Sequence, residues 1–253
     1  MLGACSSQSK AEGANDSYIL VKELEFLNQS LTKSDVNDMY VYRAQIKNNS
    51  NKTIKGINID IELSDGNYTT ISTYDTLLPG EISSYVECFG PSSGDIKDMK
   101  ATKILITMID ESNKETVIKY DVEANRYEYE EGNELSSEKP KVLVSELEFV
   151  EPTIVISEET SAQTFQAILK NNSLYKVTGV VYTFELPNGM NSYFMSQDVL
   201  EPTKSSALIS STAPESGELS DLVLKEVQYT IINDNGTTVN VTYDKKLDIY
   251  SIK

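Results

Sequence analysis

The sequence has 253 residues and a net charge of −17, from 39 acidic and 22 basic side chains. A chain of this length is typical of about two domains. The excess of carboxylates argues against nucleic acid as a partner, because nucleic-acid affinity comes from Lys and Arg side chains that meet phosphates. Since the sequence has no histidine, Ser-His-Asp relays, Cys-His relays and His-containing zinc sites are excluded.

The first residues indicate a lipid anchor. Leu2-Gly3-Ala4-Cys5 resembles a bacterial lipobox, in which the cysteine receives diacylglycerol and becomes the mature N-terminus. The basic and apolar regions of a signal peptide do not precede it, so we expect the sequence to be trimmed at this end. Residues 6–17 are small and polar, and we expect them to form a flexible tether. The alternative is a chance cysteine in a disordered tail.

From residue 19 onward, short segments alternate apolar and polar side chains and are separated by turn-forming residues. The clearest is 57–63, where Ile and Leu alternate with Asn, Asp and Glu, and Asp65-Gly66 then supplies a hairpin turn. No segment has a convincing helical period. The expected strands of the first half of the chain are 19–26, 39–48, 57–63, 68–74, 82–89, 103–109 and 115–122.

The second half of the chain repeats the first at a constant offset of 123 residues. Residues 42–50 recur as 165–173, and core positions exchange one apolar side chain for another. About seven short strands per copy predict an all-β fold of two tandem immunoglobulin-like β-sandwich domains. The expected parts are a lipobox remnant and tether over 1–17, sandwiches over 18–122 and 142–253, and an acidic linker over 123–141. A solvated linker is favoured, with a cation-binding stretch as the alternative.

Three features of the copies resemble the FxLYD-type and related immunoglobulin-like repeats of Gram-positive lipoproteins. They are the turn Lys47-Asn48-Asn49-Ser50, the alternating strand after it, and the turn Leu77-Leu78-Pro79-Gly80. The resemblance covers 19–122 and 142–247. The sequence departs from the family pattern at Thr203, which replaces the turn glycine, and at the Glu-Leu pairs of 62–63 and 185–186, where an aromatic-acidic pair is expected. The resemblance implies the fold and a location on the outer face of the cytoplasmic membrane, and it implies no common catalytic activity.

Three positions of the repeat are expected to be structural. The alternation of residues 42–46 places Asn48 inward at the end of its strand, and Asn171 has the same place in the second copy. A buried amide left unpaired costs about 1–3 kcal/mol, so both amides should bond backbone groups of the crossing loop. Cys88 aligns with Ser211 and no ionisable residue nearby marks its thiol as activated, which favours a partly buried strand residue over a reactive thiol.

The outward face of the third and fourth expected strands is the candidate ligand-binding surface. Tyrosines exposed beside carboxylates suit stacking on a sugar or anchoring a protein partner, whereas the alternative is ordinary strand tyrosine. The candidate residues are Asp60, Glu62, Tyr68, Tyr74 and Tyr193. The run Asn233-Asp234-Asn235-Gly236 is similar to the start of a calcium loop, but the distal Glu is missing and a hairpin turn is needed there. We expect no catalytic residue, no metal and no cofactor.

The sequence therefore predicts a non-enzymatic, lipid-anchored cell-surface protein that presents two interaction modules. It would reach the membrane through Cys5, since no apolar run approaches the ~20 residues of a spanning helix. The expected partner is a cell-surface protein or a glycan, and the alternative function is a pair of carbohydrate-binding modules for cell-wall or environmental glycan. Paired tyrosine platforms on a flat sheet would favour the glycan, and a large apolar patch at the domain junction would favour a protein. An enzyme is the third hypothesis, because so many acidic residues leave carboxylate pairs that counting does not exclude.

Overall fold

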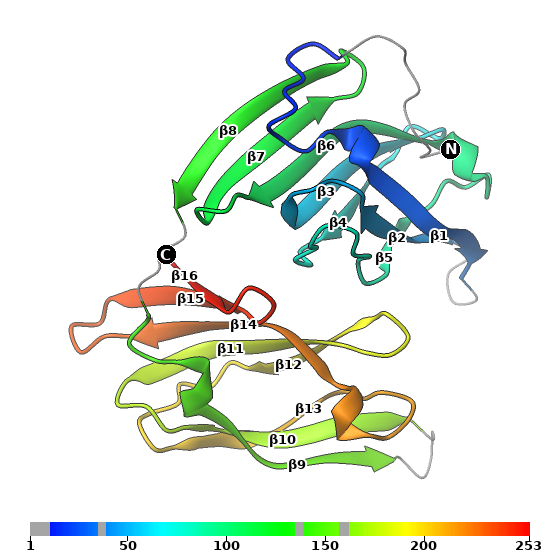
Figure 1. The fold of residues 1–253 in the computed structure, drawn as a ribbon. Helices are drawn as coiled ribbons and strands as arrows, with labels where there is room; N and C mark the ends of the chain where they lie inside the picture. Colours follow the sequence, from blue (N-terminus) through cyan, green and yellow to red (C-terminus); the bar gives the residue numbers. More distant parts are fainter. Residues whose placement is uncertain (1–10, 35–38, 135–138, 157–161) are drawn as a thin grey trace. The chain divides into compact units, whose positions relative to one another are not determined.

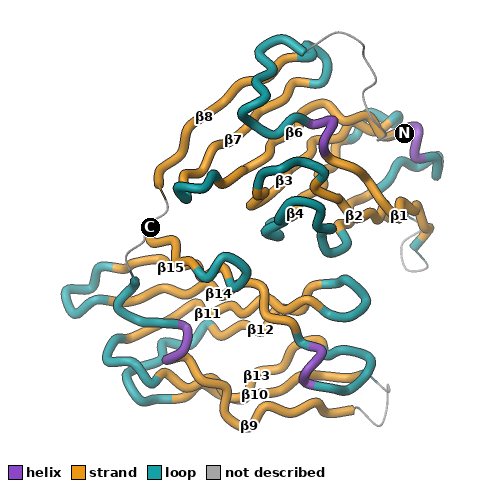
Figure 2. The backbone as a smooth tube through the Cα atoms, in the orientation of Figure 1, coloured by secondary structure: helices purple, strands orange, loops and turns teal. Residues whose placement is uncertain are grey.

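The computed structural model describes residues 11–34, 39–134, 139–156 and 162–253, and it is all-β (Figure 1). Its strands form small antiparallel sheets, and the helices within the described residues are single 3₁₀ turns (Figure 2). No helix in this part of the chain is long and apolar enough to cross a membrane. The chain divides into two compact units, Met1–Glu134 and Leu135–Lys253, called unit 1 and unit 2 below.

Unit 1 contains a three-stranded sheet in the order β1-β2-β5 and a five-stranded sheet in the order β4-β3-β6-β7-β8. All neighbouring strands pair antiparallel. The elements of unit 1 are η1 (Val21–Glu23), β1 (Leu24–Lys33), β2 (Tyr40–Asn48), β3 (Thr53–Leu63), β4 (Tyr68–Thr73), β5 (Val86–Phe89), η2 (Ile96–Asp98), β6 (Met99–Ile109), β7 (Lys114–Asp121) and β8 (Arg126–Glu134).

Unit 2 has the same two sheets, in the orders β13-β10-β9 and β12-β11-β14-β15-β16. Its elements are η3 (Val144–Glu146), β9 (Leu147–Ile156), β10 (Gln163–Asn171), β11 (Lys176–Glu185), β12 (Asn191–Ser196), β13 (Ser205–Thr212), η4 (Leu219–Asp221), β14 (Val223–Ile232), β15 (Thr238–Asp244) and β16 (Ile249–Ile252). Strands β1, β2 and β4 each begin 123 residues before β9, β10 and β12. The constant offset in the sequence is therefore an offset between equivalent strands.

The inward faces of both sheets contribute to one hydrophobic core in each unit. In unit 1 the inward positions of β3 are aliphatic, with Ile59 and Ile61 fully buried. In unit 2 the equivalent positions are aromatic, Tyr182 and Phe184, and the Phe149 ring lies 4.6 Å from the Tyr182 ring between centroids. One strand framework thus encloses two differently filled cores, which is why the repeat tolerates apolar exchange at these positions.

The structure departs from the expected linker over 123–141, because residues 126–134 within it form strand β8. β8 pairs antiparallel with β7 and extends the five-stranded sheet. Tyr127 is buried and Tyr129 packs against the core, whereas Glu130 faces outward and forms an ion pair of 2.5 Å with Lys119. β16 is the equivalent strand in unit 2, so each unit has eight strands within the described residues where about seven were expected.

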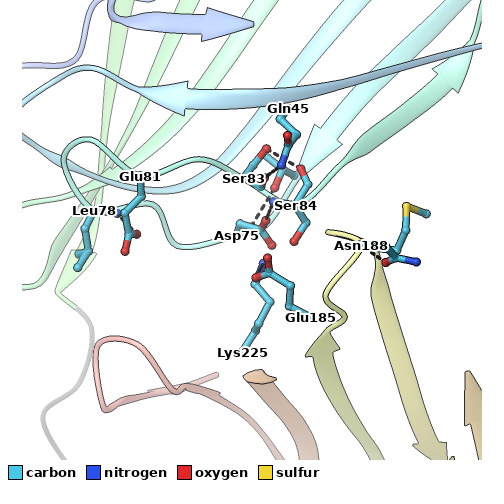
Figure 3. A network of polar contacts seen from close by, with 11 residues as sticks. Gln45, Asp75, Leu78, Glu81, Ser83, Ser84, Glu185, Asn188 and Lys225 are labelled. Atoms are coloured by element: carbon cyan, nitrogen blue, oxygen red, sulfur yellow. Dashed lines mark hydrogen bonds and ion pairs between the residues drawn. The ribbon is translucent and has the colours of Figure 1, made fainter. Parts of the chain in front are cut away.

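The fifth expected strand begins later than predicted, at Val86, and before it the chain makes an isolated bridge between Lys47 and Ile82 together with side-chain hydrogen bonds (Figure 3). The Ser83 hydroxyl accepts a hydrogen bond from Ile46 N at 2.9 Å and donates to Ser84 O at 2.6 Å. The buried Asp75 carboxylate accepts a hydrogen bond from Ser84 N at 2.6 Å. These contacts join β2 to the loop between β4 and β5. The Ser83 hydroxyl and the Asp75 carboxylate therefore bind partners within unit 1.

Part of the expected tether is docked on unit 1. Residues 11–18, called the N-terminal strap below, lie beside the start of β8 (Figure 1). Glu12 N donates to Asn125 O at 3.0 Å, and Tyr127 N donates to Glu12 O at 2.8 Å. The strap is thus a paired segment rather than a tether. Cys5 lies outside the described residues, and its lipidation stays a prediction.

Unit 2 carries a strained turn where unit 1 has glycine. Gly80 has a φ of 84°, and Thr203 at the equivalent position has a φ of 65°. Because a β-branched side chain is strained in this left-handed region, we expect Thr203→Gly to raise the free energy of unfolding of unit 2 by about 1 kcal/mol. Urea denaturation of unit 2 measures the change, and the reverse substitution Gly80→Thr should lower the stability of unit 1. An unchanged urea midpoint for Thr203→Gly would contradict the strain.

Candidate functional site

Asn48 is the centre of a buried hydrogen-bond network at the end of β2. Its side chain is fully buried, and its Nδ2 donates to Lys52 O at 2.8 Å and to Leu77 O at 3.0 Å. Its Oδ1 accepts from Ser50 N at 3.0 Å and from the Ser50 hydroxyl at 2.6 Å. One amide therefore joins the turn after β2 to the loop after β4. All four of its hydrogen-bonding positions are used within the unit, which leaves none for a ligand.

Unit 2 repeats this network with equivalent partners. Asn171 is fully buried, and its Nδ2 donates to Tyr175 O at 2.7 Å and to Leu200 O at 2.9 Å. Its Oδ1 accepts from Ser173 N at 3.0 Å and from the Ser173 hydroxyl at 2.7 Å. The inward orientation is the one that the strand alternation indicates. The repeated Asn-Asn-Ser turn is therefore part of the fold and not a binding site.

A pair of tyrosines near the last strand of each unit was missed by the sequence reasoning. In unit 1, the Tyr120 hydroxyl donates to Asn125 Oδ1 at 2.9 Å, the Tyr127 hydroxyl accepts from Val21 N at 2.9 Å, and the ring centroids lie 4.6 Å apart. The equivalent residues of unit 2 are Tyr243, Asp248, Tyr250 and Val144, with ring centroids 4.8 Å apart. The available signal was that the second tyrosine of each pair recurs at the same offset of 123 residues.

The candidate ligand-binding tyrosines of unit 1 do not form one platform. Tyr68 is 72% exposed and lies opposite Glu62 across β3 and β4, while Asp60 accepts a hydrogen bond from Thr70 at 3.3 Å. Tyr74, which is 76% exposed, lies just beyond the end of β4. Six residue steps along the chain separate the two tyrosines, a span of roughly 20 Å in extended backbone. The structure therefore brings Tyr68 to Glu62 and keeps Tyr74 apart from both.

Tyr193 lies on the outward face of unit 2 within an apolar group. It is 52% exposed on β12, and Met195 on the same face is 53% exposed. Val181 on β11 lies directly opposite Met195, and Thr183 lies directly opposite Tyr193. We call Val181, Tyr193 and Met195 the unit 2 patch.

Unit 1 has polar side chains at the positions of the unit 2 patch. These are Asn58, Thr70 and Ser72, and Asn58 Nδ2 donates to Ser72 Oγ at 3.1 Å across the two strands. Since unit 1 forms the same sheet with polar side chains here, the sheet itself does not require apolar ones. The patch is therefore a feature that distinguishes unit 2 from unit 1.

Cys88 and the glycine-containing turn of unit 2 are structural. Cys88 lies on β5 and packs against the core of unit 1, and burial raises the pKa of its thiol to about 11. The thiol is thus protonated at neutral pH and a poor nucleophile. Gly236 N donates to Asn233 O at 2.9 Å in a hairpin turn between β14 and β15. Across the ranges that the structure describes, no group of three or more Cys, Asp and Glu side chains is arranged to hold a metal ion.

No protein-family model matches the chain, and no curated protein matches it. Among solved structures, it is similar to the exo-β-D-glucosaminidase CsxA, with a TM-score of 0.21 and 12% identity over 83% of this chain and 26% of that chain. A second similar structure is red sea bream transglutaminase, with a TM-score of 0.20 and 10% identity over 92% of this chain and 31% of that chain. The chain thus spans less than a third of the length of either structure.

Proposed function

We propose that the chain is a non-enzymatic, lipid-anchored cell-surface protein of a Gram-positive bacterium that presents two immunoglobulin-like β-sandwich modules of the FxLYD type. The sandwich assignment is supported by the antiparallel sheets of each unit, whose inward faces share one core. The anchor is supported by the lipobox-like sequence that ends at Cys5. Unit 2 is the module that contacts the partner, and the partner is a protein with an apolar contact surface.

The unit 2 patch is the observation that carries the interaction role. Exposed Tyr and Met side chains are enriched at protein interfaces, where they supply apolar area with little polar desolvation. Both units have the same strand framework. The apolar side chains of the unit 2 patch are therefore not needed for the fold. These three positions are polar in unit 1 and apolar in unit 2, which supports selection for contact with a partner.

The glycan alternative has less support. A pair of equivalent carbohydrate modules would need stacking tyrosines at equivalent places in both units. Tyr68 and Tyr74 of unit 1 correspond to Asn191 and Gln197 of unit 2, and Tyr193 of unit 2 corresponds to a threonine of unit 1. The exposed tyrosines therefore do not repeat with the fold.

A grafted variant tests the interaction role. We expect Val181→Asn, Tyr193→Thr and Met195→Ser together to preserve unit 2, because unit 1 carries these residues on the same strands. A photo-cross-linking residue replaces Thr183, and the protein is irradiated in intact cell envelope. The triple substitution, called the graft, should lower the yield of the cross-linked protein adduct at least about tenfold. The control places the cross-linker at Asp60 of unit 1, where no adduct is expected. An equal yield with and without the graft would contradict the proposal.

The anchor has its own test. Full-length precursor in a Gram-positive host should incorporate labelled palmitate at Cys5, and Cys5→Ala should be shed or remain unprocessed. The anchored fraction after cell fractionation is the measurement. Equal membrane retention of both forms would remove the lipid anchor from the proposal.

A further inference from the structure

The N-terminal strap is attached to unit 1 by backbone pairing, side-chain packing and ring stacking together. Besides the two backbone hydrogen bonds of Glu12, Asn15 N donates to the Tyr129 hydroxyl at 3.0 Å. The rings of Tyr18 and Tyr129 stack with centroids 4.4 Å apart. Ala11 and Ala14 pack against the core. From residue 11 onward, the position of the chain is therefore set by unit 1.

Glycine at position 13 is what allows the strap to approach β8. Gly13 has a φ of 73°, and a Cβ at this position would lie 2.6 Å from Tyr127 O. Cβ atoms do not approach a backbone oxygen so closely, so any side chain here displaces the strap. Gly66 offers a matched comparison, because it has a φ of 82° and no atom would lie within 4 Å of its Cβ.

Only a short length of chain separates the strap from the proposed lipid. Six residue steps lead from Cys5 to Ala11, and a fully extended chain of that length spans at most about 20 Å. The strap begins beside Asn125, in the turn between β7 and β8. The other end of β7, an eight-residue strand, lies roughly 25 Å away along the sheet.

We propose that the N-terminal strap holds the β7–β8 turn of unit 1 at the membrane surface, so that this turn is the membrane-facing end of the unit. The inference rests on the proposed lipid anchor at Cys5, and the membrane is contacted through that lipid. The net charge of −17 means that the chain is not drawn to anionic headgroups. The orientation of unit 1 depends on the strap and on the short chain between Cys5 and Ala11, not on electrostatic attraction to lipid headgroups. We therefore expect high salt to leave the orientation unchanged.

Fluorescence quenching in vesicles tests this arrangement. The lipidated full chain carries Cys88→Ser and one labelling site, either Glu123→Cys in the β7–β8 turn or Glu111→Cys in the β6–β7 turn. Both positions are exposed glutamates in turns at opposite ends of β7. With nitroxide-headgroup lipids, quenching at position 123 should exceed quenching at position 111 by at least about twofold, given their different distances from the anchor. Equal quenching, or stronger quenching at position 111, would overturn the inference.

The matched glycine variants test the part played by the strap. Gly13→Ala should reduce the difference in quenching between the two positions, because releasing the strap lengthens the connection from the lipid to unit 1. Gly66→Ala, which adds a similar backbone strain away from the strap, should leave the difference unchanged. An unchanged difference in Gly13→Ala would overturn the role of the strap. A chain that fails to join the vesicles at all would instead remove the proposed anchor, and this inference with it.

Discussion

Replacing Asn48 with alanine is expected to lower the free energy of unfolding of unit 1 by about 3 kcal/mol. The substitution removes two donors from buried carbonyls, Lys52 O and Leu77 O, and the acceptor of the Ser50 amide and hydroxyl. Buried polar groups that lose their partners keep the cost of desolvation, which makes such losses larger than the net worth of a single hydrogen bond. Urea denaturation of unit 1 measures the effect, and Asn171→Ala should reproduce it in unit 2.

The neighbouring asparagines provide the control for this prediction. Asn49 is exposed and donates to Glu25 Oε2 at 3.0 Å, and Asn172 donates to Glu148 Oε2 at 2.7 Å in the same way. Alanine at either position should cost about 0.5 kcal/mol or less, as is usual for surface substitutions. If Asn49→Ala proved costlier than Asn48→Ala, the buried network would not be what stabilises this end of the unit.

Unit 2 is expected to lose about 3 kcal/mol of stability between pH 9 and pH 11 through two buried tyrosines. Tyr182 donates to Leu147 O at 2.8 Å and Tyr229 donates to Val142 O at 2.5 Å, and both side chains are buried. Burial raises the pKa of both phenols well above the ordinary value of 10.0. The folded unit therefore keeps both protons at a pH where the unfolded chain has released them.

The sign of the pH effect follows from this difference in bound protons. Below pH 10 both states are protonated and the stability is unaffected, whereas above it each retained proton costs about 1.4 kcal/mol per pH unit. Urea melts of unit 2 at pH 9 and pH 11 give the loss directly. The double variant with Tyr182→Phe and Tyr229→Phe should start less stable and lose clearly less over the same interval. An equal loss in the double variant would show that these two phenols are not its cause.

Much of the fold follows from period-two alternation, and the part that was missed shows where this signal weakens. Ile57, Ile59 and Ile61 are all buried on β3, because one face of the strand is apolar and the other polar. In β8 the inward residues are Tyr127 and Tyr129 among glutamates, so the local composition resembles a solvated linker. A tyrosine ring can pack at the edge of a hydrophobic core while its hydroxyl forms a hydrogen bond with a backbone group. Amino-acid composition alone does not reveal this arrangement.

The candidate site was predictable only where orientation alone was needed. The inward position of Asn48 followed from the alternation of β2, which fixes the face of every residue in the strand. The separation of Tyr68 from Tyr74 was already implied by the expected strand over 68–74, whereas the exposure of Met195 depends on β12 lying at the edge of its sheet. Sheet order is set by tertiary pairing, so that exposure was not available from local sequence.

Calorimetry of fragments tests most directly the central claim that each copy is a complete eight-strand unit. Residues 11–134 and 139–253 should each unfold in one cooperative transition. Residues 11–122 lack β8 together with Tyr127 and its hydrogen bond to Val21 N, so this shorter fragment should be unfolded or should melt well below 11–134. Equal melting temperatures for 11–122 and 11–134 would contradict the claim, as would a fragment 139–253 that does not fold alone.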